Sequence, residues 1–419
     1  MTKKLLVVAM VASGIVGFSG LAKADSSSVT IYGYLNPDFG FAKTTGATAI
    51  GSTVSSLSPA ASGVNLPSRS EVNANVTLLG FSGSEDLGGG LKATFQLEDG
   101  ILVDTGGRYQ RNSKVGIAGG FGEVWLGFWN TPMKEITYGT ILMDPLGAEN
   151  VSSGESIMGS PGFNKGNSAW GSNGGTWGSS NGPVNANFDL YGANGVNYRT
   201  ANLGGFVGQF QYSANEGKGR ASPAGGGNTI DPSMLSGAIL YNVDPVAVSF
   251  AYEEHKDQFG IFAINGAPNG ATSAKDKAYR INGGFKFGTG TIISAAYERL
   301  DYKSSGSISN VTNYKRNAWQ IGGSQTFGPH TLHARFNKAD PGSCDRVGGG
   351  CSTTNLGAKM YALGYDYSLS KRTSLFAYYA KIDNESSAQY SFSFGSTIAG
   401  GAAVGANSEA AGVGIRTGF

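Results

Sequence analysis

The amino-acid sequence predicts an all-β protein, a 16-stranded antiparallel transmembrane β-barrel, on three observations. Charged residues make up 14% of the 419 residues, against about 25% in ordinary soluble domains. Beyond the N-terminus the sequence has no apolar run of about 20 residues, which excludes a bundle of transmembrane helices. Its 22 Phe, 19 Tyr and 5 Trp exclude a disordered chain. A barrel whose strands alternate apolar and polar residues satisfies all three observations.

Residues 1–24 have the pattern of a secretory signal peptide. Lys3 and Lys4 form a basic start, residues 5–21 an apolar core, and Ala22-Lys23-Ala24 a small-residue cleavage site. An uncleaved membrane anchor is the alternative, although the core is short and broken by glycine. Without the leader, 28 basic residues face 29 acidic ones, so the mature chain carries no excess of positive charge that would favour nucleic-acid binding.

Period-two segments bounded by turn residues are predicted to form the strands of the barrel, residues 25–419. We expect these strands to begin at about residues 28, 71, 91, 110, 121, 187, 205, 235, 246, 277, 291, 316, 330, 358, 373 and 409. In the strand that begins at about residue 91, Phe95 and Leu97 would face lipid. Gln96 and Glu98 would face a water-filled lumen. A β-sandwich would alternate in the same way, but the low charge and the length of the chain disfavour it.

The longest predicted loop is the third, at about residues 130–185, and it is rich in Gly, Ser and Asn. A structureless stretch of this length in a compact protein is usually functional, or its strands have been misassigned. It carries aromatic and acidic side chains, namely Trp170, Trp177, Asp144, Glu149 and Glu155.

The two cysteines, Cys344 and Cys351, lie in one Gly-rich segment. In an exported protein this spacing indicates a disulfide that closes a small loop. A metal pair is the weaker interpretation, because none of the three histidines is near in sequence, and we predict no metal site.

The sequence offers little chemistry for an enzyme. A G-x-S-x-G match at residues 178–182 lies in a Ser/Gly-rich loop, without the strand-turn-helix context of a nucleophile elbow. Glu298 and Asp366 are interpreted as solvated lumen residues. No phosphate-binding loop, EF-hand or zinc spacing is found, so the sequence predicts no cofactor.

Several segments carry a family resemblance. They are SVTIYG at 28–33, SEDLGGGLKATFQLE at 84–98, YDYSLSKRT at 365–373 and the terminal GIRTGF at 414–419. They resemble the trimeric general-diffusion porins of Gram-negative outer membranes, of the betaproteobacterial type. The resemblance implies a homotrimer among outer-membrane lipids, with a water-filled channel for passive diffusion of small hydrophilic solutes and ions. It also implies that the terminal Phe419 is part of the signal read by the outer-membrane assembly machinery.

The resemblance further implies that the third loop folds into the lumen, where its acids face a ladder of wall arginines. Only one of the four family arginines is matched here, by Arg111; Leu78, Phe128 and Tyr191 stand at the other three positions. Arg111 shares the parity of the lipid-facing Val115, so its lumenal place depends on the resemblance. Which of the loop acids faces it stays open.

A constriction with one such arginine would have a weak transverse field. We therefore expect it to favour neutral, aromatic or sugar-like solutes over small anions, with Trp129, Trp170, Trp177 and Tyr191 available for stacking. Charges elsewhere on the long third loop are the alternative. The first competing function is a substrate-selective porin. A less favoured one is an adhesin or enzyme on a plugged barrel.

Overall fold

The computed structural model describes residues 28–138, 152–162, 169–170, 186–214, 218–219, 229–258, 260–261, 273–305, 311–393 and 402–419. The predicted signal peptide lies outside these residues. None of the helices in the described part is long and apolar enough to cross a membrane.

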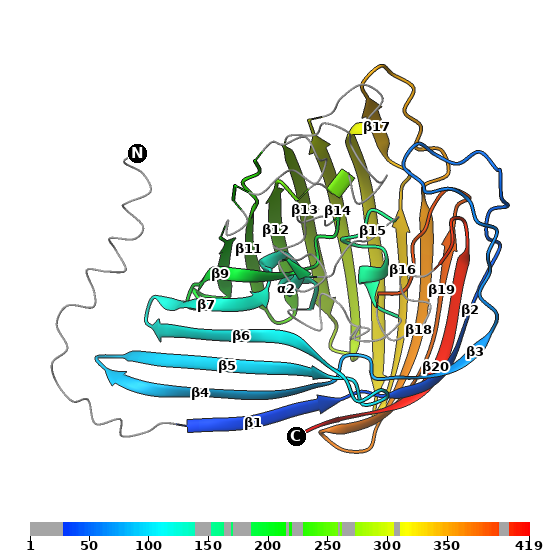
Figure 1. The fold of residues 1–419 in the computed structure, drawn as a ribbon. Coiled ribbons are helices and arrows are strands. Elements are labelled where there is room, and N and C mark those ends of the chain that lie inside the picture. Colours follow the sequence, from blue (N-terminus) through cyan, green and yellow to red (C-terminus); the bar gives the residue numbers. More distant parts are fainter. Residues whose placement is uncertain are drawn as a thin grey trace.

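The chain forms a closed 16-strand antiparallel barrel, as predicted (Figure 1). The strands are β1 (Ser28–Leu35), β2 (Asp38–Thr45), β3 (Arg69–Asn73), β4 (Leu78–Gly88), β5 (Leu91–Ile101), β6 (Arg108–Gly119), β7 (Gly122–Asn130), β8 (Ala169–Trp170), β9 (Tyr191–Arg199), β10 (Phe206–Ser213), β11 (Ser233–Val243), β12 (Val246–Lys256), β13 (Ala274–Lys286), β14 (Thr291–Ser304), β15 (Val311–Phe327), β16 (His330–Ala339), β17 (Ser343–Arg346), β18 (Ala358–Ser368), β19 (Thr373–Asn384) and β20 (Asn407–Gly418). The strands begin within about five residues of the expected positions. The barrel closes where β1 and β2 pair with β20.

The described residues contain twenty strand segments, from which the sixteen barrel strands are built. The first two barrel strands are each broken in the middle, into β1 with β2 and β3 with β4, and the short β8 and β17 are loop segments that pair with β9 and β15. The first break contains Pro37, which has no N–H to donate to a neighbouring strand. Side chains from the second break fill the gap: Thr77 Oγ1 accepts from the Asn36 N–H at 3.0 Å, and Asn75 donates to the Asn36 carbonyl at 2.9 Å. The two halves of the first strand therefore run in different directions (Figure 1).

Alternation along the strands separates a lipid face from a lumenal face. Leu97 is 55% exposed and the next residue, Glu98, is 9% exposed. Phe210 and Gln211 differ in the same way, at 45% and 0%. Exposed apolar side chains on the outer surface suit a bilayer.

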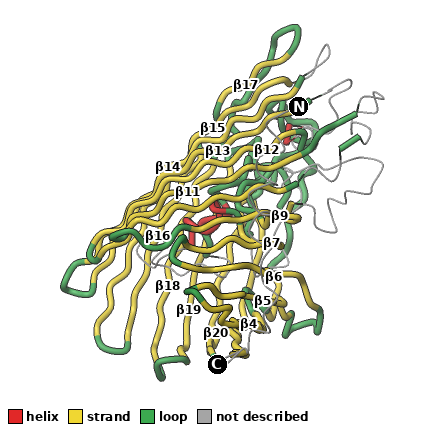
Figure 2. The backbone as a smooth tube through the Cα atoms, turned by 90° about the vertical axis from the view of Figure 1, so that its left-hand side faces the viewer, coloured by secondary structure: helices red, strands yellow, loops and turns green. Residues whose placement is uncertain are grey.

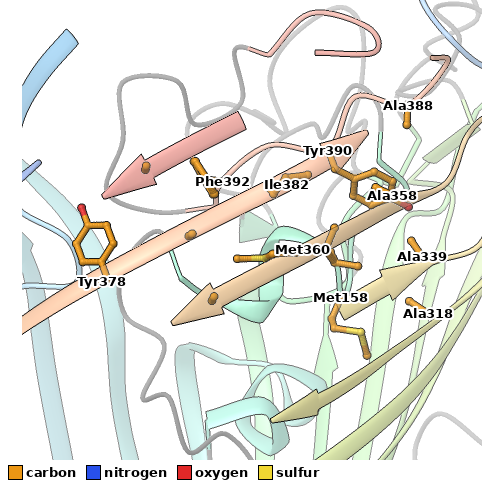
Figure 3. Packing of buried hydrophobic residues seen from close by; sticks show 14 of the residues in the cluster. Met158, Ala318, Ala339, Ala358, Met360, Tyr378, Ile382, Ala388, Tyr390 and Phe392 are labelled. Atoms are coloured by element: carbon orange, nitrogen blue, oxygen red, sulfur yellow. The ribbon is translucent and has the colours of Figure 1, made fainter. Parts of the chain in front are cut away.

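The third loop begins inside the barrel with α2 (Pro132–Tyr138) and continues to the 3-10 turn η1 (Gly154–Ser156); Figure 2 shows both helices in red within the barrel. Residues 385–393 of the loop after β19 join it there. Met158 of the third loop shares one buried apolar cluster with Met360 and Ile382 of the wall and with Tyr390 and Phe392 of that last loop (Figure 3). Apolar packing thus holds two loops against the inner wall.

Candidate pore constriction

Arg111 lies on the lumenal face of β6 because of a β-bulge. In the pairing of β5 with β6, Leu97 lies opposite Ser113 but Asp99 lies opposite Gln110, so β6 carries one extra residue here. A bulge of this kind reverses the parity of the strand on its far side. The side chain of Arg111 is accordingly only 12% exposed, with its Nε 3.7 Å from a carboxylate oxygen of Glu98.

Two of the residues at the positions where the resemblance implies arginines lie against each other. The rings of Phe128 on β7 and Tyr191 on β9 stack at 5.1 Å with an interplanar angle of 6°. The amino group of Lys134, from α2, lies 5.4 Å from the centre of the Tyr191 ring. Stacked rings with a cation above one face make a flat aromatic surface beside a positive charge.

A second aromatic pair continues this wall along β7. Trp125 and Trp129 pack edge to face at 5.5 Å, and the amino group of Lys114 lies within 5.0 Å of both rings. The Trp129 indole N–H donates to Glu135 of α2 at 2.6 Å. Burial raises the pKa of Glu135 above its ordinary 4.5, although the hydrogen bonds from Trp129 and Gln209 favour the charged carboxylate.

A buried ion network on the opposite side binds the third loop to the wall. Arg280 on β13 makes a bidentate pair with Asp189, at 2.6 and 2.9 Å, and its Nε donates to Glu298 on β14 at 2.9 Å. Arg316 on β15 pairs with the other oxygen of Glu298 at 3.0 Å. The interpretation of Glu298 as a solvated residue was wrong: it is fully buried, because the loop covers it and the Gly159 N–H donates to it at 2.9 Å.

Wall arginines also donate to carbonyl groups of the loop. Arg316 donates to the carbonyls of Ser160 at 3.0 Å and Ile157 at 2.8 Å. Arg335 on β16 donates to the Ser152 carbonyl at 2.8 Å. The neighbouring strands β14, β15 and β16 therefore position residues 152–162. Their side chains give hydrogen-bond partners to buried backbone groups of the loop that would otherwise have none.

The other predicted site residues divide as follows. Glu155 lies 2.8 Å from Lys134 of the same loop, which is its ion-pair partner in place of Arg111. The backbone of Trp170 pairs in parallel with β9 at Gly192. Asp144, Glu149 and Trp177 lie outside the described residues. Asp366, which we expected to be solvated, is partly buried and pairs with His333 at 2.7 Å and Arg416 at 3.3 Å.

The remaining predictions concern the cysteines, the chain end and metals. A disulfide joins Cys344 and Cys351, whose Cα atoms are 5.8 Å apart. Phe419 lies against Gly33 of β1, with backbone hydrogen bonds in both directions at 3.2 and 3.1 Å. Within the described part of the chain, no group of three or more His, Cys, Asp or Glu could hold a metal ion.

Sequence reasoning missed Arg280, Arg316 and Arg335. The signal that could have found them is parity, since each shares the lumenal face of its strand with small or amide side chains such as Asn282, Ala318 and Asn337. Parity places an arginine in the lumen, but it does not say that a loop will bind it.

The family model for Gram-negative porins matches residues 7–387. The chain belongs to the Gram-negative porin family. Outer membrane porin protein 32 of Delftia acidovorans is 26% identical, over 100% of both chains. An outer membrane porin protein of Bordetella pertussis is 28% identical over 91% of this chain and 94% of its own.

Solved porin structures share the fold. An anion-selective porin from Comamonas acidovorans matches with a TM-score of 0.70 at 23% identity, over 94% of this chain and 100% of its own. The trimer form of OmpT from Vibrio cholerae matches with a TM-score of 0.55 at 13% identity, over 94% and 100%. This porin is thus an outer-membrane channel for passive diffusion, and the comparisons point to a channel in place of an enzyme.

Proposed function

We propose that this porin is a homotrimer whose third loop narrows each channel beside β6, β7 and β9, and that the channel passes small hydrophilic solutes with little selection by charge. The observation that carries the proposal is that three cations beside the aromatic wall each have a carboxylate partner. Arg111 lies near Glu98, at 3.7 Å, and Lys114 pairs with Glu123, at 2.6 Å. Lys134 pairs with Glu155.

Compensated charges produce only a weak field across a water-filled pore. On the opposite wall, Arg280 and Arg316 are buried against Asp189 and Glu298, so their charge also does not reach the solute. Tyr191, partly exposed and stacked on the buried Phe128, then offers an aromatic surface where the resemblance implies a cation. Such a surface favours neutral, aromatic or sugar-like solutes over small anions.

The edge of β1 supports the trimer. Residues 28–34 pair with β4 on one side, but β20 reaches only Tyr34 and Leu35 on the other. The edge of β1 before Gly33 leaves backbone groups without a strand partner among the described strands. A neighbouring subunit would cover them where water is scarce. We also propose that residues 1–24 are removed on export and that the assembly machinery reads Phe419.

The test is the reversal potential and conductance of the refolded mature chain in a planar bilayer under a KCl gradient. We expect conductance in steps of three with weak ion selectivity. Phe128→Arg should move the reversal potential toward anions, whereas the control Phe128→Leu should not. Strong anion selectivity in the wild type would contradict the weak field, and an absence of conductance would contradict the open channel.

A substrate-selective porin is the second candidate, because the partly exposed Tyr191, held by the buried Phe128, could stack on a ring in the pore. It predicts that flux of a sugar or an aromatic solute into liposomes saturates with concentration. In that case Tyr191→Leu should abolish saturation while it leaves KCl conductance nearly unchanged. If flux rises linearly with concentration in both the wild type and Tyr191→Leu, the substrate-selective porin is rejected in favour of the general-diffusion channel.

A further inference from the structure

The outer surface of the barrel carries an unusual row of cations at the long-loop ends of β12, β13 and β14. Lys256, Lys275 and Lys303 stand directly opposite one another in the register of these three strands. Their sequence neighbours His255 and Tyr302 are fully buried on the lumenal side, so the lysines face outward. Like charges directly opposite on neighbouring strands destabilise a sheet.

Nearby carboxylates compensate this row only in part. Lys256 pairs with Asp231 at 2.9 Å, and Lys275 pairs with Glu254 at 2.9 Å. Glu254 is shared, since Lys277 also lies 3.6 Å from it. Within the described part of the chain, no ion pair is formed by Lys303.

More positive charge surrounds the row. Arg299 is exposed on the same face of β14, four residues before Lys303, and Lys315 on β15 is 3.9 Å from Asp301. Around the row, seven cations therefore stand near four carboxylates: Lys218 lies 3.9 Å from Asp231, and the exposed Asp345 is in register with Lys303 through Asn313. The patch has a net positive charge that the described part of the protein does not neutralise.

The position of the patch in the membrane indicates its partner. Aromatic side chains lie just below it on the same outward face, with Tyr252 and Tyr279 in contact at 5.2 Å and Tyr297 opposite Trp319 on the next strands. Girdles of aromatic residues mark the level where hydrocarbon meets the headgroups. Because the lysines lie beyond the girdle, at the ends of β12, β13 and β14 that lead into the long loops, they are at the level of the headgroups of the outer leaflet.

We propose that the row Lys256, Lys275 and Lys303 binds the phosphate groups of an anionic lipid in the outer leaflet. A phosphate accepts several hydrogen bonds and carries more than one negative charge, so a single group can bridge two neighbouring lysines. Lipid binding offsets the repulsion between the opposed lysines. The row is a lipid site on the outside of the barrel, separate from the pore.

The experiment uses the folded mature porin in nonionic detergent, titrated with diphosphorylated lipid A and with the same glycolipid after removal of both phosphates. Native mass spectrometry counts the lipids retained by each chain. We expect the triple variant Lys256→Gln, Lys275→Gln, Lys303→Gln to bind the phosphorylated lipid about 100-fold more weakly. The dephosphorylated lipid should bind the wild type and the triple variant equally.

Matched variants distinguish binding at the lysine row from a general effect of the positive charge of the protein. Lys286→Gln, Lys371→Gln, Arg372→Gln removes three exposed cations at the short-turn end and should bind the phosphorylated lipid as the wild type does. Lys303→Gln alone breaks no ion pair among the described residues and should still weaken binding about fivefold. The variant Lys256→Arg, Lys275→Arg, Lys303→Arg should retain binding of the phosphorylated lipid.

Several results would overturn the proposal. They are equal binding by the wild type and the triple variant, an equal loss in the short-turn control, and complete displacement of the lipid by excess inorganic phosphate, which would indicate a simple anion site. Conductance of the triple variant in a planar bilayer should equal that of the wild type. A closed channel in every protein would refute the proposed function but not the lipid site.

Discussion

Replacing Arg316 by methionine should release the third loop from the wall without opening the barrel. The guanidinium holds the carbonyls of Ile157 and Ser160 and pairs with Glu298 at 3.0 Å, all of them buried. Removing one partner of a buried ion pair costs about 3–5 kcal/mol. Because Glu298 keeps its hydrogen bond from Arg280, the lower figure applies. About 3 kcal/mol corresponds to an increase of about 100-fold in the population of the open loop.

Hydrogen exchange at the Gly159 amide measures this opening, since that N–H donates to Glu298. The amide should exchange about 100-fold faster in Arg316→Met, and single channels should show more current noise because the loop moves in the pore. Arg299→Met is the control, because Arg299 lies on the outward face of β14. The reasoning fails if Gly159 exchanges at the wild-type rate in Arg316→Met, or if the control accelerates it equally.

Two further predictions concern α2 and the chain end. Since burial raises the pKa of Glu135 above 4.5, the folded state holds this proton more tightly than the unfolded state. The free energy of unfolding should therefore fall as the pH rises from about 4.5 through the raised pKa, and stay level above it. Fluorescence of Trp129 should follow the same titration, and Glu135→Gln should abolish it. In Gly33→Ala the new Cβ would overlap the Phe419 ring, so the yield of heat-resistant folded barrel on a gel should fall. Gly283→Ala, where no atom lies within 4 Å of the added Cβ, should fold normally; equal yields would show that the chain end tolerates displacement.

Much of the barrel could be predicted because its determinants are local. Turn residues and period-two alternation lie within about ten residues of one another, so strand starts and faces follow from the sequence. The lipid-facing Leu97 and the lumenal Glu98 are examples. The broken first strand was not predicted, since its gap is filled by Thr77 and Asn75 from another strand.

The constriction could be predicted only in part, because it depends on contacts between distant residues. Parity alone would have placed Arg111 in lipid; one extra residue in β6 turns it to the lumen. Glu155 is an acid of the third loop, as expected, but its partner Lys134 comes from the same loop. Which charges form a pair depends on the conformation of the loop. The alternation of apolar and polar residues along the strands carries no information about that conformation.

The joint between the first and last strands has a consequence for how the chain is completed. It is made at three heights: at Phe419 beside Gly33, along β2 and β20, and at the outer mouth, where Thr48 donates to the Ser386 carbonyl, 338 residues away in sequence. Each neighbouring hairpin can form from a short stretch of chain, but this joint cannot form before synthesis ends. A polypeptide that stops short of β20 leaves β2 and β19 with open edges, which a membrane does not tolerate. The joint therefore distinguishes complete polypeptides from truncated ones, because only a chain that includes β20 can close the barrel.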